Sequence, residues 1–166
     1  MSRLFWITFA AAMGLYVLMS VWSAPFLSQE AAGQRMFDMR PMGYSYDAAV
    51  SFLRALSGPG RDFYLGVQHR LDLVYPALLG LSFVAAFLWA LTSRLRWGLV
   101  GVAIVGAVAD YAENFHVARM LRAGVDGLTP QMVATASLFT QVKSIAVTIC
   151  FMALIGLALR SLWRRR

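Results

Sequence analysis

The sequence predicts an all-α membrane protein, a bundle of four transmembrane helices with one short amphipathic helix in the outer loop between the first two. The chain has 166 residues, of which 60% are hydrophobic and 14% are charged, whereas a soluble domain is about half apolar and about a quarter charged. The mean hydropathy is +0.63. Four stretches are each long and apolar enough to cross the hydrocarbon core of a bilayer, which takes about 20 residues.

The composition excludes an ordinary soluble globular protein, and it excludes intrinsic disorder, which requires low hydrophobicity. The length fits a single domain over residues 1–166. The only cysteine, Cys150, lies in an apolar stretch, so the sequence has no disulfide framework and no CxxC site. The net charge is +7, but the basic residues flank apolar stretches. We therefore expect membrane lipids as partners, with anionic headgroups among them, and no nucleic acid.

The predicted spans cover residues 4–26, 71–91, 97–121 and 132–159. The first stretch is longer than the apolar core of a signal peptide, about 7–15 residues, which favours an uncleaved span. The third stretch begins with small apolar residues that allow close helix packing, and it becomes polar in its second half. Before the fourth, Thr129-Pro130 has the pattern of a helix N-cap followed by a first-turn proline.

Arginine positions predict the orientation of the spans. One side of the membrane holds the two tails and the loop 92–96, with seven arginines in these short segments: Arg3, Arg94, Arg96, Arg160, Arg164, Arg165 and Arg166. The opposite side also holds seven, spread over the long loop and the span ends. Short basic segments beside spans have the larger effect on topology. The sequence therefore predicts a multi-pass protein of a bacterial-type inner (plasma) membrane with both termini in the cytoplasm.

The long outer loop contains a predicted amphipathic helix over residues 45–57. Its apolar residues recur with helical spacing at Ala49, Phe52, Leu53 and Leu56. Ser45 is the predicted N-cap, and we expect the sequence Gly-Pro-Gly at 58–60 to end the helix. Such a helix lies flat on the membrane surface or caps the bundle. The functional alternative is a lid over a pocket.

Ionisable residues inside the predicted spans are the most informative feature of the sequence. Asp110, Glu113 and Asn114 share one face of the third span, at i, i+3 and i+4 spacing. Asp110 lies about 20 Å along the helix from Trp97, which places it in the outer half of the bilayer. Lys143 lies about 16 Å from the outer end of the fourth span. We expect Lys143 to pair with Asp110 or Glu113, because unpaired ions at this depth are unfavourable.

The second span contributes to the same cluster. Gln68, Asp72 and Tyr75 share a face at i, i+4 and i+7 spacing, and we expect Arg70 to pair with Asp72 or Glu113. The spans together predict one polar cluster in the outer half of the bundle. Such a cluster can serve only to tie helices together, with contacts of roughly 0.6 to 2 kcal/mol each. We favour a functional site, because ionisable residues in membrane spans mark one by default.

The first functional hypothesis is a polar pocket that binds a lipid or a small amphiphile, or that docks a partner membrane protein or a second copy of the chain. Pockets between bundle helices with a few convergent polar groups are typical ligand sites. The candidate binding residues are Arg70, Asp72, Tyr75, Asp110, Tyr111, Glu113, Asn114, Gln141 and Lys143. No catalytic residue stands out, so the sequence leaves open whether the protein is an enzyme.

Two alternatives belong to other functional classes. His69 and Asp72 form a carboxylate–histidine pair at i, i+3 spacing, as do Glu113 and His116, and these four residues have the ligand types of a mononuclear metal site. The two histidines are also candidate axial ligands of a haem. Either cofactor would indicate a metal- or haem-dependent membrane enzyme, and neither is favoured. The third hypothesis is a dimeric proton-coupled transporter in which Asp110 or Glu113 carries the proton.

Overall fold

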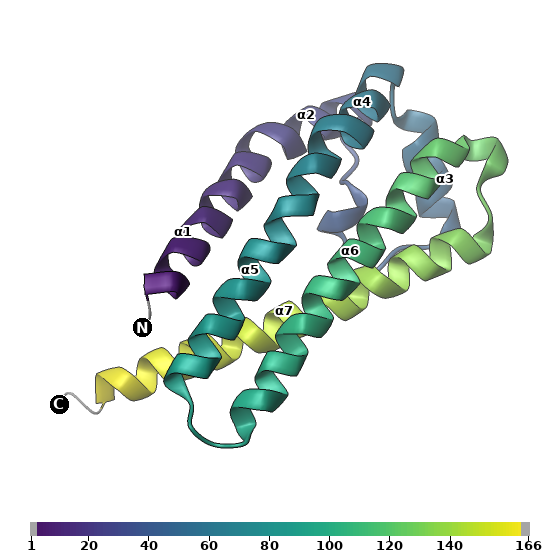
Figure 1. The fold of residues 1–166 in the computed structure, drawn as a ribbon. Helices are drawn as coiled ribbons and strands as arrows, with labels where there is room; N and C mark the ends of the chain where they lie inside the picture. Colours follow the sequence, from purple (N-terminus) through teal and green to yellow (C-terminus); the bar gives the residue numbers. More distant parts are fainter. Residues whose placement is uncertain (1–2, 164–166) are drawn as a thin grey trace.

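The computed structural model describes residues 3–163, and every regular element in that range is a helix (Figure 1). Residues 164–166 of the basic tail lie outside the described residues. In chain order the elements are α1 (Arg3–Leu18), η1 (Met19–Ser23), α2 (Ala24–Glu30), η2 (Phe37–Met39), α3 (Tyr46–Ala55), α4 (Gly58–Phe63), η3 (Tyr64–Gln68), α5 (His69–Ala90), α6 (Leu95–Gly127) and α7 (Pro130–Trp163). The elements η1 and η3 are π-helical turns inside longer helices, and η2 is a short 3-10 helix.

Four helical stretches are long and apolar enough to cross a membrane, which fits an integral, multi-pass membrane protein. They are Arg3–Glu30, Gly58–Ala90, Leu95–Gly127 and Pro130–Trp163. The predicted four-helix bundle is therefore confirmed. Each helix is longer than the predicted span, because helical hydrogen bonding continues through polar residues that hydropathy assigns to loops. The hydroxyl of Thr129 accepts a hydrogen bond from the Met132 N–H at 3.2 Å, so α7 begins with the predicted cap.

The bundle has two edge helices. Helix α5 packs against α1 on one side and α6 on the other, and α6 packs against α7, so α1 and α7 form the two edges. Figure 1 shows both chain ends and the α5–α6 connection at one end of the bundle, which we call the terminal end. Residues 31–57 lie over the opposite end, which we call the loop end.

Helix α3 caps the loop end. Its N-cap is Ser45, whose hydroxyl accepts a hydrogen bond from the Ala48 N–H at 3.2 Å. Ala49 and Phe52 are completely buried, and α3 packs against α6 and α7. The expected role of residues 58–60 is wrong: these residues do not end α3 but begin α4. The Ser57 hydroxyl accepts from the Gly60 N–H at 3.0 Å, and a proline suits the first turn of a helix.

Two apolar cores stabilise the bundle, one at each end. The loop-end core is centred on Leu27, Phe37, Phe52, Tyr64 and Met120. The terminal-end core is centred on Leu79, Phe83, Phe87, Ala103 and Cys150. In α6, in α7 and in the continuous stretch from α4 through η3 to α5, the polar residues lie between the parts of the helix that enter these two cores. The polar cluster is therefore enclosed by apolar packing on both sides along the bundle axis.

Candidate functional site

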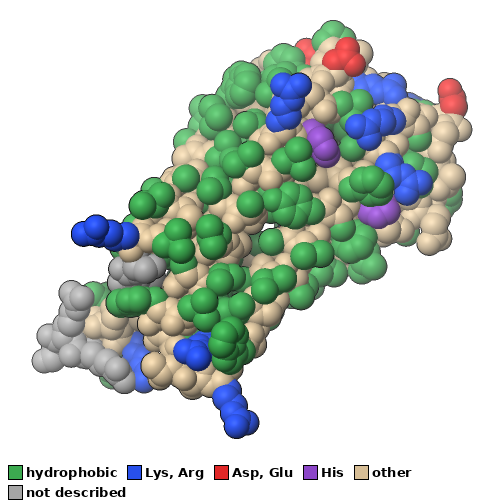
Figure 2. All heavy atoms as spheres, in the orientation of Figure 1, with side chains coloured by type: hydrophobic (Ala, Val, Ile, Leu, Met, Phe, Trp, Pro, Cys, Tyr) green, Lys and Arg blue, Asp and Glu red, His purple; other side chains and the backbone are tan. Residues whose placement is uncertain are grey.

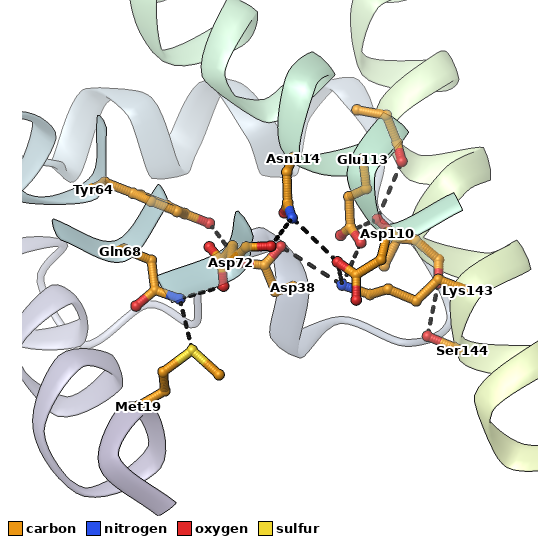
Figure 3. A network of polar contacts seen from close by, with 12 residues as sticks. Met19, Asp38, Tyr64, Gln68, Asp72, Asp110, Glu113, Asn114, Lys143 and Ser144 are labelled. Carbon is orange, nitrogen blue, oxygen red and sulfur yellow. Dashed lines mark hydrogen bonds and ion pairs between the residues drawn. The ribbon is translucent and has the colours of Figure 1, made fainter. Parts of the chain in front are cut away.

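A single lysine is the centre of the polar cluster (Figure 3). The ammonium of Lys143, on α7, lies 3.3 Å from a carboxylate oxygen of Asp110 and forms a closer ion pair with Glu113, both on α6. It also lies 3.9 Å from a carboxylate oxygen of Asp38. The side chain of Glu113 is fully buried and that of Lys143 is 14% exposed. The predicted pairing of Lys143 with Asp110 or Glu113 is present with both partners.

Neutral side chains position these carboxylates. The Thr140 hydroxyl donates to Glu113 Oε1 at 2.7 Å. The Asn114 amide donates to Asp110 Oδ1 at 3.3 Å and to the backbone oxygen of Asp72 at 3.1 Å. These contacts link α5, α6 and α7 at one level of the bundle, as Figure 3 shows. The cluster is therefore a continuous hydrogen-bonded network and not a set of isolated charges.

One carboxylate of the network comes from the loop and not from a span. Asp38 lies in η2, within the segment 31–45 between α2 and α3, which we call the strap. The Tyr64 hydroxyl donates to Asp38 Oδ2 at 3.2 Å, and Oδ1 of Asp38 is buried on the side of Lys143. We define the charged centre as Lys143 with the four carboxylates of Asp38, Asp72, Asp110 and Glu113.

The strap is held against α7 by two further contacts. The Tyr44 N–H donates to the Ser137 hydroxyl at 2.9 Å. Gly43 has φ of 83°, which favours glycine, and a Cβ there would lie 2.5 Å from side-chain atoms of Ser137 and Gln141, which would have to move. Burial near Glu113 and Asp38 raises the pKa of the Tyr44 phenol above its usual value. Tyr44 is therefore a neutral group beside the charged centre at physiological pH.

Two π-helical turns bring the first span into the network. Gln68, in η3, donates to Asp72 Oδ1 at 2.8 Å and contacts the sulfur of Met19, in η1, at 3.6 Å. The Ser23 hydroxyl, also in η1, donates to the side-chain oxygen of Gln68. Gln68 therefore connects α1 to the charged centre. Such π-helical turns inside longer helices occur frequently at functional sites.

A cavity of about 300 Å³ adjoins the charged centre. Its polar wall is formed by Asp38, Asp72, Asp110 and Lys143, and its apolar wall includes Tyr16, Met19, Tyr75, Leu79 and Val147. These residues come from every span and from the strap, and the cavity lies between the two edge helices. Tyr16 is 52% exposed while lining the cavity. The cavity therefore reaches the surface of the bundle beside α1.

The charges of the centre do not balance. The centre holds four carboxylates and one ammonium group. Three of the carboxylates lie within 4.0 Å of Lys143, and within residues 3–163 every ion pair closer than 4.0 Å involves this lysine. Buried carboxylates without a cation are strongly unfavourable in a low-dielectric interior. The excess must be compensated by bound cations, which are either protons or a positively charged ligand. This imbalance separates the centre from an ordinary interhelical ion pair.

The structure divides the predicted binding residues into three groups. Asp72, Tyr75, Asp110 and Lys143 line the cavity, with Glu113 and Asn114 behind them in the network. Tyr111 and Gln141 lie outside it. The Tyr111 hydroxyl donates to the backbone oxygen of Leu73 at 2.8 Å, and Gln141 contacts the strap at Gly43.

The expected pairing of Arg70 is wrong. Arg70 is exposed and makes no ion pair with Asp72 or Glu113 in the described part of the chain. The reason is helical phase: Arg70 is two residues from both Gln68 and Asp72, and two residues correspond to a rotation of about 200°. When Gln68 and Asp72 face the bundle, Arg70 faces away from it.

The structure does not assemble the predicted metal site. Among residues 3–163 there is no group of three or more histidine, cysteine and carboxylate side chains placed to hold a metal ion. His69 lies between α5 and α6, near Asp72 and Asn114. His116 stacks on Phe139 of α7, with ring centroids 5.6 Å apart. His69 thus lies at the contact of α5 with α6, and His116 at the contact of α6 with α7.

The sequence interpretation placed Gln68 on the cluster's face of the second span but not among the candidate binding residues, and it missed Asp38 as a member of the network. Gln68 had a signal, because it shares a helical face with Asp72 and Tyr75. Asp38 had none, because helical periodicity does not report how a loop folds back onto a bundle.

No protein-family model, curated protein or solved structure matches the chain. The function is therefore inferred from the site itself.

Proposed function

We propose that the protein binds the cationic headgroup of a membrane amphiphile in the cavity between α1 and α7. One observation carries the proposal: the cavity presents the carboxylates of Asp38, Asp72 and Asp110 together with an apolar wall. Amphiphiles combine a polar group with a hydrocarbon tail, so a site for one needs both kinds of wall in one cavity.

The sign of the headgroup follows from the charge imbalance. Lys143 already pairs with Asp110 and Glu113, and it is the only cation within 4.0 Å of the carboxylates among the described residues. An anionic ligand would add negative charge to an acidic site. An amine or a quaternary ammonium group would instead reduce the excess of negative charge.

The apolar side of the cavity supports the same ligand class. Tyr16 and Tyr75 line it together, with ring centroids 6.2 Å apart. Aromatic faces attract cations, and they do so more strongly where water is excluded. A volume of about 300 Å³ holds a headgroup and the first carbons of a chain. The rest of the tail would pass beside the exposed ring of Tyr16 into the surrounding lipid.

The site has a proposed position in the membrane. The density of arginines in the two tails and in the loop 92–96 favours a cytoplasmic terminal end. The cavity would then lie in the outer half of an inner membrane. An amphiphile of the outer leaflet would reach it laterally, between the edge helices.

The binding test uses two probes with the same chain length, dodecylamine and dodecanoate, titrated into the full chain in lipid nanodiscs. We expect saturable binding of dodecylamine and none of dodecanoate. Asp110→Asn keeps the shape of the side chain and removes one charge, so it should weaken dodecylamine binding about tenfold, as for a close charge pair. The matched control is Asp62→Asn, which changes an exposed acid outside the cavity. Equal affinity for the two probes, or equal affinity of the two variants, would contradict the proposal.

The charge imbalance also supports a second candidate function, proton-coupled transport. Protons and cationic ligands would compete for the same carboxylates, because either one compensates the excess charge. Calorimetric titration of dodecylamine in two buffers of different ionisation enthalpy measures this coupling. A heat that depends on the ionisation enthalpy of the buffer shows that amine binding exchanges protons with the solvent, which a proton-coupled transporter requires. A heat that does not depend on the buffer would support amphiphile binding without proton coupling.

A further inference from the structure

A cluster of arginines at the loop end lies apart from the charged centre. It consists of Arg61 on α4 and of Arg119 and Arg122 on α6, and we call it the arginine patch. Arg119 and Arg122 are exposed and share one face of α6, at i, i+3 spacing. Arg61 reaches the same place, because its guanidinium donates to the backbone oxygen of Arg122 at 2.9 Å. Figure 2 shows basic side chains gathered at the loop end on this face.

The patch has no acidic partner. Within residues 3–163 every ion pair closer than 4.0 Å involves Lys143, so no carboxylate neutralises Arg61, Arg119 or Arg122. Asp62 and Asp126, the acids nearest in sequence, are not paired with them. The guanidinium of Arg119 instead lies over the ring of Phe115, 5.8 Å from its centroid. Arg61 is held by a backbone carbonyl and Arg119 by a ring, so guanidinium donors of the patch are available to bind an anion.

The depth of the patch identifies the kind of anion. The exposed face of α6 is apolar from Trp97 through Ile104 and Val108 to Phe115. Phe115 lies 18 residues after Trp97, which corresponds to about 27 Å along the helix at 1.5 Å per residue. This length is close to the hydrocarbon thickness of a bilayer, about 30 Å. Arg119 follows one turn after Phe115. If the apolar face spans the hydrocarbon, the guanidinium groups lie at the level of the lipid phosphates.

We propose that the arginine patch binds the headgroup of an anionic phospholipid, with the acyl chains along the apolar face of α6. The planar guanidinium matches a phosphate with paired donors. The patch should prefer a lipid with a net negative charge over a zwitterionic lipid, because the cationic group of a zwitterionic headgroup would be repelled by the arginines. The patch lies on α4 and α6, and its residues do not line the cavity, so this site does not depend on the proposed amphiphile site.

The binding assay uses the full chain in detergent with phosphatidylglycerol and phosphatidylcholine of identical acyl chains, and counts bound lipids by native mass spectrometry. We expect wild type to retain phosphatidylglycerol in preference to phosphatidylcholine. The double variant Arg119→Gln/Arg122→Gln should bind phosphatidylglycerol about tenfold more weakly, since each arginine near a membrane surface contributes several-fold. The matched control is Arg35→Gln/Arg54→Gln, which removes the same charge from exposed loop-end positions outside the spans.

Two results would overturn the proposal. One is equal retention of the two lipids by wild type. The other is a loss in the control variant as large as that in the Arg119 and Arg122 variant, which would indicate a general charge effect. A further arm adds millimolar sodium phosphate, and we expect no displacement of phosphatidylglycerol. Full displacement would show a site for free phosphate and would contradict the assignment to a lipid.

Discussion

In the terminal half of the bundle, the helices pack through small side chains. A Cβ on Gly80 would lie 3.2 Å from the Cβ of Ala107, and one on Gly106 would lie 3.1 Å from the Cβ of Ala146. In the loop half, the same helices meet through Lys143 and the carboxylates around it. The comparison shows one set of helices in close apolar contact at one level of the bundle and linked by charge at another level, between the two apolar cores.

The two kinds of contact leave different amounts of space. Beside Gly80 and Gly106 the free volume is about 10 Å³, which is near the minimum for one water molecule. Beside Lys143 it is about 300 Å³. Long polar side chains can link helices across a gap that small apolar side chains would close. The charged centre therefore allows a cavity to exist in the interior of a narrow bundle.

The strongest test of this comparison removes the central cation. Lys143→Met should lower the free energy of unfolding by about 3 kcal/mol, because it leaves several buried carboxylates without a partner. The measurement is unfolding by sodium dodecyl sulfate, followed by circular dichroism. Adding Glu113→Gln should recover part of the loss. The control is Ile145→Met, at a lipid-exposed position of the same helix. A loss no larger than in this control would show that the charged centre does not stabilise the contact between α6 and α7.

An intermediate effect is expected in the terminal half. Gly106→Leu should destabilise the protein by about 2 kcal/mol, because the larger side chain separates α6 from α7. Gly101→Leu is the matched control, since a Cβ at Gly101 has no neighbour within 4 Å. The same unfolding assay applies. If both glycines tolerate leucine equally, close packing is not what holds this half together.

The smallest effect concerns the strap. Gly43 and Gly33 both have positive φ, of 83° and 82°, so alanine at either position meets the same backbone strain. Only at Gly43 would the added Cβ meet α7, through Ser137 and Gln141. Gly43→Ala should therefore loosen the strap by about 1 kcal/mol more than Gly33→Ala.

The measurable consequence is limited proteolysis after Arg35, the arginine of the strap that is not followed by a proline. Trypsin should cleave the Gly43→Ala variant roughly fivefold faster than the Gly33→Ala variant, because cleavage follows the population of the open form. Equal rates in the two variants would mean that the contact with α7 does not hold the strap in place.

Hydropathy was sufficient to predict the four spans, because membrane helices must be long and apolar along their length. The ion pair of Lys143 was also predictable, since a buried charge requires a partner at the same depth. The pairing proposed for Arg70 failed because hydropathy ignores the direction of a side chain around its helix. Asp38 could not be found, because its position depends on the strap folding back across the bundle, and no periodicity in the sequence describes that.

The location of the bound amphiphile is the most direct test of the proposed cavity site. A dodecylamine that carries a photoreactive diazirine near its amine would be bound to the wild-type protein in nanodiscs and irradiated, and the labelled residues identified by mass spectrometry. We expect the label on the cavity wall, at Tyr16, Met19 or Val147, and its loss when unlabelled dodecylamine is in excess. Labelling that follows lipid exposure, at Ile104 and Ile155 for example, and that unlabelled amine does not reduce, would contradict a cation-binding cavity between α1 and α7.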